Sequence, residues 1–173
     1  MSEFSRAFRL DTIGTTARSV TIEASVDERA ALAQRFGLVA LDSLTATATL
    51  VQQSTAIIAS GMLDAALTQS CIASAEDVPA IISEPFSIHF VASLADDETP
   101  DELELLADDC DSVEHDGQSV DLGEAVAQSL GLALNPFPRC AEAARILRAA
   151  GVLSEDEVVG GAFAGLKGLL RKS

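Results

Sequence analysis

Residues 38–71 read LVALDSLTATATLVQQSTAIIASGMLDAALTQSC, and in this stretch apolar and polar side chains alternate. Within 44–51, every second residue is Leu or Ala and most of the others are Thr. This period of two is typical of a β-strand with one buried face. We predict one long strand over 38–52 and a second over 55–71. The short link Gln52-Gln53-Ser54 predicts that the two form an antiparallel hairpin.

Further strands are expected on both sides of this hairpin. Residues 3–10 and 18–24 alternate upstream of it, and residues 78–91 follow downstream. In the last of these, Pro79 and Pro85 indicate an edge position or a bulge, because proline cannot donate to a neighbouring strand.

Helical periodicity appears in one segment ahead of the hairpin and predominates in the second half of the chain. Helices are expected near 26–36, 121–134, 140–150 and 162–171. Ser25 and Glu28 have the spacing of a capping box at the first helix, and Asp121 caps the second. Strands followed by helices predict an α+β fold with a mainly antiparallel sheet, whose long strands can curl toward a barrel. We expect a single domain over 1–173, with a long acidic loop at 95–119.

Charge is distributed very unevenly along the chain. The formal net charge is -16, and no Lys or Arg lies between Arg35 and Arg139, an interval with 18 Asp and Glu residues. Thirteen of these carboxylates fall within residues 96–124. Such a surface repels phosphate backbones, whose binding depends on Lys and Arg. Charge therefore disfavours direct contact with nucleic acid and favours a basic protein partner.

No constellation of catalytic or metal-binding residues emerges, so we expect neither an enzyme nor a cofactor. Cys71, Cys110 and Cys140 lie far apart, without the short spacing of a zinc site, and are expected to be reduced thiols. His89 and His115 have no neighbours that would make them catalytic bases. No leader-like apolar segment follows the N-terminal charges and no apolar run reaches the roughly 18 residues of a membrane span, so a cytoplasmic location is expected.

The most distinctive segment is Asp121–Arg139, a capped helix that a proline-bracketed turn brings to an end. Two arrangements of the turn Asn135-Pro136-Phe137-Pro138-Arg139 are compatible with the sequence. The turn either packs Phe137 into the core or presents Phe137 and Arg139 in an extended form to a partner.

Three elements of the sequence resemble the YceD family, the large ribosomal RNA subunit accumulation proteins. They are Gly61–Cys71 ahead of Glu84-Pro85-Phe86, then Asp121-Leu122-Gly123-Glu124 with Leu132–Arg139, and finally Ala162–Lys167. Many family members carry a Cys-x-x-Cys in the first element. Here Ser74 takes the second cysteine position and only Cys140 follows the proline-rich turn, so the resemblance implies no metal site in this chain.

The resemblance implies a non-enzymatic role in the accumulation or processing of large-subunit ribosomal RNA. Combined with the charge, it suggests binding to a basic ribosomal or assembly protein. The alternative is an RNA-binding module that uses the basic ends, with Arg6, Arg9, Arg139, Arg145, Lys167, Arg171 and Lys172 on one face. The residues assigned to partner binding are Asp96, Asp97, Glu98, Asp101, Glu102, Glu104, Asp108, Asp109, Asp111, Asn135, Pro136, Phe137, Pro138, Arg139, Phe163 and Lys167.

Overall fold

The computed structural model describes residues 2–54, 56–92 and 112–152. The chain divides into two compact units. The first is Met1–Gln69 with Pro79–Pro136, and the second is Ser70–Val78 with Phe137–Ser173. The expectation of a single domain over the whole chain stays a prediction.

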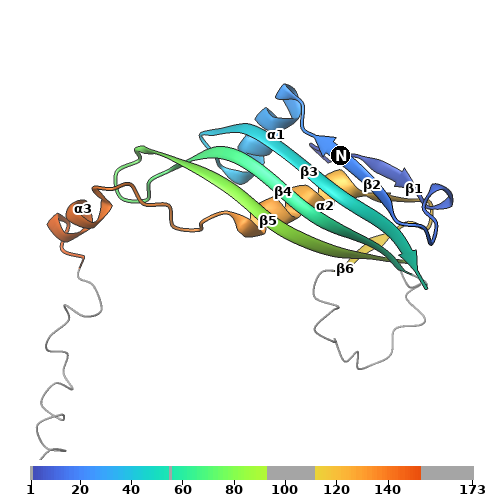
Figure 1. The fold of residues 1–173 in the computed structure, drawn as a ribbon. Coiled ribbons are helices and arrows are strands. Elements are labelled where there is room, and N and C mark those ends of the chain that lie inside the picture. Colours follow the sequence, from blue (N-terminus) through green and yellow to red (C-terminus); the bar gives the residue numbers. More distant parts are fainter. Residues whose placement is uncertain (1, 55, 93–111, 153–173) are drawn as a thin grey trace, which may run out of the picture. The chain divides into compact units, whose positions relative to one another are not determined.

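A five-stranded sheet with the order β2-β3-β4-β5-β6 forms the first unit (Figure 1). Its strands are β2 (Arg18–Glu23), β3 (Ala40–Gln53), β4 (Ala56–Ser70), β5 (Asp77–Ala92) and β6 (Ser112–His115). β3 pairs antiparallel with both β2 and β4, so the predicted hairpin is confirmed. β6 pairs in parallel with residues 89–92 of β5. The earlier part of β5, which contains Pro79 and Pro85, does not pair with β6, so it forms an edge of the sheet as the prolines indicated.

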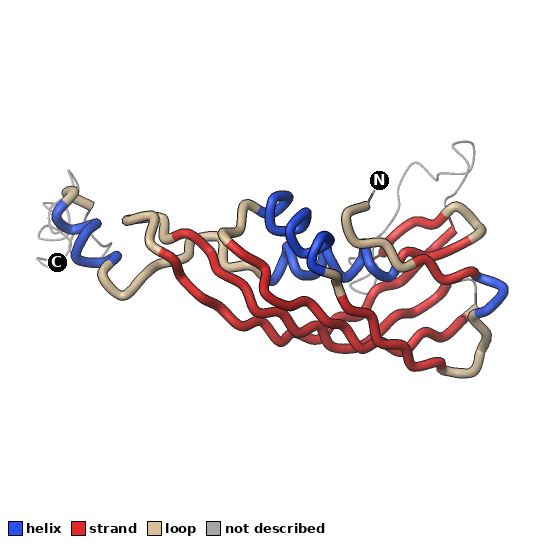
Figure 2. Tube along the Cα trace, turned by 90° about the horizontal axis from the view of Figure 1, so that it is seen from above, coloured by secondary structure: helices blue, strands red, loops and turns tan. Residues whose placement is uncertain are grey.

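Two helices lie on the same face of this sheet (Figures 1 and 2). They are α1 (Val26–Phe36) and α2 (Leu122–Ala133), close to the predicted bounds. Ser25 and Glu28 form the expected capping box, and Gly37 ends α1 in the left-handed conformation. Leu122, Val126 and Leu130 of α2 are fully buried among the inward-facing side chains of the strands. The α+β class with a mainly antiparallel sheet is therefore confirmed.

One glycine permits the close approach of the two longest strands. Gly61 of β4 lies opposite Ala48 of β3. A Cβ atom at this position would overlap the Thr47 carbonyl oxygen and lie 2.8 Å from Ala48 Cα. Only a residue without a side chain fits here without moving the partner strand.

A small second sheet pairs a strand near the N-terminus with the strand that directly precedes α2. β1 (Ala7–Arg9) pairs antiparallel with β7 (Ser119–Asp121), with Phe8 opposite Val120. The strand predicted over 3–10 is therefore too long. Phe4 is buried in the core instead, and Leu10–Thr12 forms a short 3-10 helix.

Two other expectations need correction. The sheet does not close into a barrel in the described residues, because β2 and β6 remain its edges and side chains of α2 fill the face that a barrel would enclose. The predicted acidic loop of 95–119 does not extend to residue 119. Ser112–His115 forms β6, with Val113 against the core, and Ser119 begins β7. Residues 95–111 of that loop and the helix predicted near 162–171 lie outside the described residues.

The second unit contains the helix α3 (Ala143–Ala149), which is shorter than the helix predicted over 140–150. It begins after Cys140, whose backbone N–H donates to the Cys71 sulfur, and the Cys140 carbonyl accepts from Ala143 N–H. Residues 140–142 thus form a turn that leads into the helix.

Candidate functional site

Asp121 links the start of α2 to the N-terminal segment of the chain. Its carboxylate accepts the backbone N–H of Glu124 at 3.2 Å, as the sequence predicted for a helix cap. The same carboxylate accepts the backbone N–H of Arg6 at 2.8 Å and the Ser5 hydroxyl at 2.6 Å. One side chain therefore caps α2 and holds the strand β1 in position.

Glu124, in the first turn of α2, binds Arg35 in the last turn of α1. Its two carboxylate oxygens accept from both terminal nitrogens of Arg35, at 2.8 and 2.9 Å, and Ser2 donates to it at 2.6 Å. The hydrogen bonds from Arg35 outweigh partial burial and lower the pKa of Glu124 to about 2. This carboxylate is therefore ionised at neutral pH and forms a charge-assisted pair with Arg35.

Gly123 completes this connection by letting two backbones approach closely. A Cβ atom here would lie 2.6 Å from the Phe4 carbonyl oxygen and 2.8 Å from Arg6 N. Together with buried Leu122, the segment Asp121–Glu124 joins α1, α2 and β1. Structural contacts within the fold therefore account for Asp, Gly and Glu at positions 121, 123 and 124.

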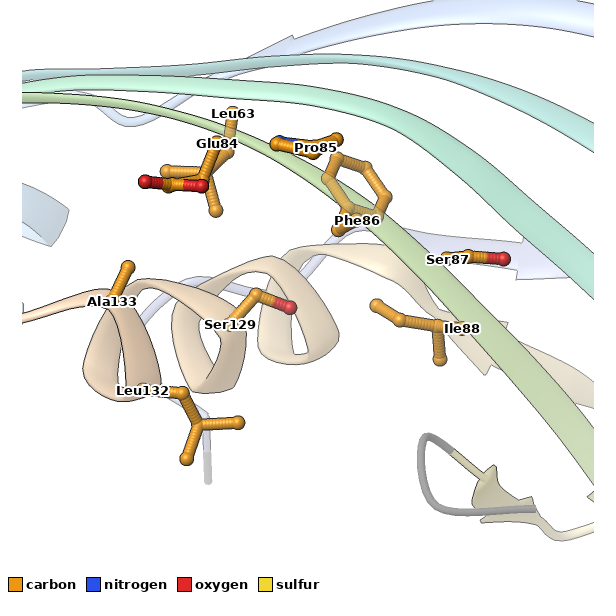
Figure 3. A pocket seen from close by; sticks show the side chains of 9 residues that line it. All are labelled: Leu63, Glu84, Pro85, Phe86, Ser87, Ile88, Ser129, Leu132 and Ala133. Carbon is orange, nitrogen blue, oxygen red and sulfur yellow. The ribbon is translucent and has the colours of Figure 1, made fainter. Parts of the chain in front are cut away.

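The candidate interaction site of the first unit is a cleft between β5 and α2. It has a volume of about 290 Å³ and is lined by residues 84–88 of β5, by Ser129, Leu132 and Ala133 of α2, and by Leu63 (Figure 3). Most of the lining residues are apolar, but Glu84 adds a carboxylate to the lining. Leu132 is 84% exposed. Such a cleft offers an apolar contact beside a negative charge.

The arginines of the first unit make contacts within the fold. Arg6 forms an ion pair with Glu28 at 2.6 Å, and Arg9 forms one with Asp11 at 2.7 Å. The other contacts are those of Arg18 over the Phe8 ring, Arg29 with the Ala24 carbonyl at 2.8 Å, and Arg35 with Glu3 and Glu124. Each of the five cations that precede the long interval without Lys or Arg thus has a partner inside the protein.

The proline-rich turn falls partly in each unit. In the first unit, Gln69 donates to the Asn135 carbonyl at 2.9 Å, and Pro136 is exposed. In the second unit, Pro138 is buried and its carbonyl accepts from Ile72 N–H at 3.0 Å. Phe137 is 65% exposed, so packing of this ring into the core is ruled out for the described structure. Arg139 is exposed as well.

A cluster that the sequence did not predict lies in the second unit. The sulfur atoms of Cys71 and Cys140 are 3.2 Å apart, and the Ser74 hydroxyl lies 3.3 Å from the Cys140 sulfur. Ser74 also donates to Glu76 at 2.9 Å. Among the described residues, no group of three or more His, Cys, Asp or Glu side chains is placed to hold a metal ion. The replacement of a second cysteine by Ser74 was the one sequence signal near this cluster.

The described ranges contain only part of the residues that the sequence analysis assigned to partner binding. Those that lie outside the described residues are Asp96, Asp97, Glu98, Asp101, Glu102, Glu104, Asp108, Asp109, Asp111, Phe163 and Lys167. Both histidines lie within the described residues. His89 is half-buried in β5, and His115 of β6 accepts the backbone N–H of Gly117 at 3.1 Å.

Comparison with known proteins gives one match. The model of a protein family described as "Large ribosomal RNA subunit accumulation protein YceD" matches residues 59–170. No curated protein and no solved structure matches the chain. Within the described part of the chain, no helix has the length and apolar character needed to cross a membrane.

Proposed function

Because this chain belongs to the YceD family of large ribosomal RNA subunit accumulation proteins, we propose that it is a non-enzymatic factor that binds a basic ribosomal or assembly protein. The family name implies a role in the accumulation of large-subunit ribosomal RNA. The proposal adds how this chain contributes: it engages a cationic protein that itself belongs on the ribosomal RNA.

The observation that carries the proposal is the internal pairing of the arginines. Arg6, Arg9 and Arg35 each donate to a carboxylate of the same chain. A phosphate would have to displace these carboxylates before it could bind the guanidinium groups. The acidic residues, by contrast, far outnumber the cations, with 27 Asp and Glu against 11 Lys and Arg. A partner rich in Lys and Arg would be attracted to this excess of negative charge.

The cleft between β5 and α2 gives such a partner a place to bind. Exposed Leu132 and the cleft floor around Phe86 offer apolar contact, and Glu84 offers a carboxylate. A segment with an apolar side chain next to a Lys or Arg would match both features. Apolar contact would supply affinity, and the surrounding negative charge would raise the association rate.

The alternative function, RNA binding through the basic ends, has less support from the described contacts. Of its residues, Arg6, Arg9 and Arg145 are each ion-paired, the last with Glu142 at 2.6 Å. Arg139 is exposed and would be its best-placed member among the described residues. Lys167, Arg171 and Lys172 lie outside the described residues.

Neutralisation of three of the carboxylates within residues 96–124 tests the proposal. The triple variant Asp108→Asn, Asp109→Asn, Asp111→Asn should capture large-subunit ribosomal proteins much more weakly than the unaltered chain. The matched control is Glu23→Gln, Asp27→Asn, Asp42→Asn, which changes the net charge equally at exposed positions elsewhere. Equal losses in both variants would indicate a non-specific charge effect. No capture by the unaltered chain would refute the proposal.

A further inference from the structure

Two segments of the second unit come into contact at a pair of free cysteines. Cys71 follows β4, and Cys140 precedes α3. Ile72 N–H donates to the Pro138 carbonyl at 3.0 Å, and Cys140 N–H donates to the Cys71 sulfur at 3.2 Å. These backbone contacts fix the positions of the two cysteines relative to each other.

From this geometry we infer that Cys71 and Cys140 form a reversible dithiol–disulfide site, which reacts with low-molecular-weight disulfides. The two sulfur atoms are 3.2 Å apart, so an approach of about 1.2 Å would reach the length of an S–S bond. The cysteines are 69 residues apart in the sequence. The fold, rather than chain proximity, therefore brings them into contact.

The surroundings of Cys71 favour its thiolate. The backbone N–H of Cys140 donates to its sulfur, and the Ser74 hydroxyl and the backbone of Ala73 assist, so that the pKa of Cys71 falls to about 6. For Cys140, a hydrogen bond with Ser74 acts in the same direction, but those with Glu76 and Cys71 outweigh it and raise the pKa of the thiol. The pair thus shares one proton, held mainly by Cys140. A thiolate beside a thiol is the reactive form for disulfide exchange.

Exposure decides the order of the two steps. Cys71 is 3% exposed, whereas Cys140 is partly exposed. The Cys140 sulfur therefore attacks the external disulfide RSSR, passes its proton to Cys71, and releases RS⁻ as the mixed disulfide forms. Cys71 then loses that proton to RS⁻ and attacks the Cys140 sulfur, which releases the second RS⁻. The two cysteines lose two electrons in total, and RSSR takes them up to become RSH and RS⁻.

The consequence of this reaction would be local. The disulfide would tie the turn Ser70–Val78 to the segment that carries Phe137 and Arg139. Because both of these side chains are exposed, oxidation would fix the way they are presented without covering them. The inference does not depend on the proposed function, since it concerns thiol chemistry alone.

The test uses the full chain with Cys110→Ser, so that only one pair of cysteines remains. The protein is incubated with oxidised glutathione, quenched in acid, alkylated and mapped by mass spectrometry. We expect a Cys71–Cys140 cross-link that excess dithiothreitol reverses. It should form about tenfold faster or more in the folded protein than in urea, since unfolding separates the two residues by a long loop. The inference would be overturned by glutathione adducts on the separate cysteines without a cross-link, by no reaction in the folded protein, or by equal rates in both states.

Discussion

Both terminal nitrogens of Arg35 lie within 2.9 Å of the Glu124 carboxylate, so the last turn of α1 is tied to the first turn of α2. The Arg35 side chain is 30% exposed and that of Glu124 is 24% exposed. The pair is partly buried and has the bidentate geometry that makes the contribution of an ion pair to stability measurable. It links the two helices of the first unit.

Loss of this pair should weaken the fold. Glu124→Gln should lower the free energy of unfolding by about 1 kcal/mol, because Arg35 loses a charged partner while the shape of the side chain is kept. Urea denaturation followed by circular dichroism measures the change. Asp11→Asn, which removes an exposed pair with Arg9, is the control and should leave the unfolding midpoint unchanged. A midpoint for Glu124→Gln equal to that of the control would contradict this role.

Stability should decrease as the pH falls below about 4.5. Hydrogen bonds from Arg6 and Arg35 lower the pKa values of Glu28 and Glu124, respectively, to about 2, whereas the ordinary value is about 4.5. A lowered pKa in the folded state stabilises the protein above the unfolded pKa, and this stabilisation is lost as pH falls from about 4.5 to about 2. Urea denaturation from pH 6 to pH 2 should show this decrease, and Glu28→Gln with Glu124→Gln should reduce it. A wild-type stability that stays constant over the same range would disprove the assignment.

Gly61 should tolerate no side chain. In Gly61→Ala the new methyl group would overlap the Thr47 carbonyl and force β3 and β4 apart, at a cost of about 2–4 kcal/mol of unfolding free energy. Gly14→Ala is the matched control, because its nearest neighbour would be 4.0 Å away. Thermal unfolding of the two variants gives the comparison. Similar melting temperatures would mean that the strands can separate without loss.

The cleft between β5 and α2 should contribute to binding but not to folding. Leu132→Ser should leave the unfolding midpoint nearly unchanged, because the side chain is 84% exposed. It should weaken capture of the basic partner. Ile81→Ser is the control, since Ile81 is equally exposed, at 87%, and lies outside the cleft lining. If both variants bind as tightly as the unaltered chain, the cleft is not the site of contact.

The sequence predicted those parts of the fold in which a single pattern dominates. The alternation over 44–51 gave the hairpin correctly, and the capping box at Ser25 gave the start of α1. By contrast, the sequence predicts a loop where the structure has β6, because three of its residues are polar or charged and Val113 alone packs against the core. A strand of four residues with one apolar side chain has no detectable period.

The site was less predictable because its contacts join distant residues. The exposed state of Phe137 could not be decided from the proline-bracketed turn, since the same residues fit a packed or an exposed ring. The contact between Cys71 and Cys140 spans 69 positions, and no local spacing could reveal it. The acidic residues assigned to partner binding remain a prediction, as do the cytoplasmic location and the absence of enzymatic activity.

The central claim is that a cationic protein, rather than bare ribosomal RNA, is the direct partner. The most direct measurement is titration calorimetry of the full chain against large-subunit ribosomal proteins and, separately, against protein-free large-subunit ribosomal RNA, at about 50 and about 300 mM salt. We predict binding to at least one basic protein, with an affinity that falls at the higher salt concentration, and no measurable binding to the RNA. Binding to the RNA without binding to any of the proteins would contradict the account.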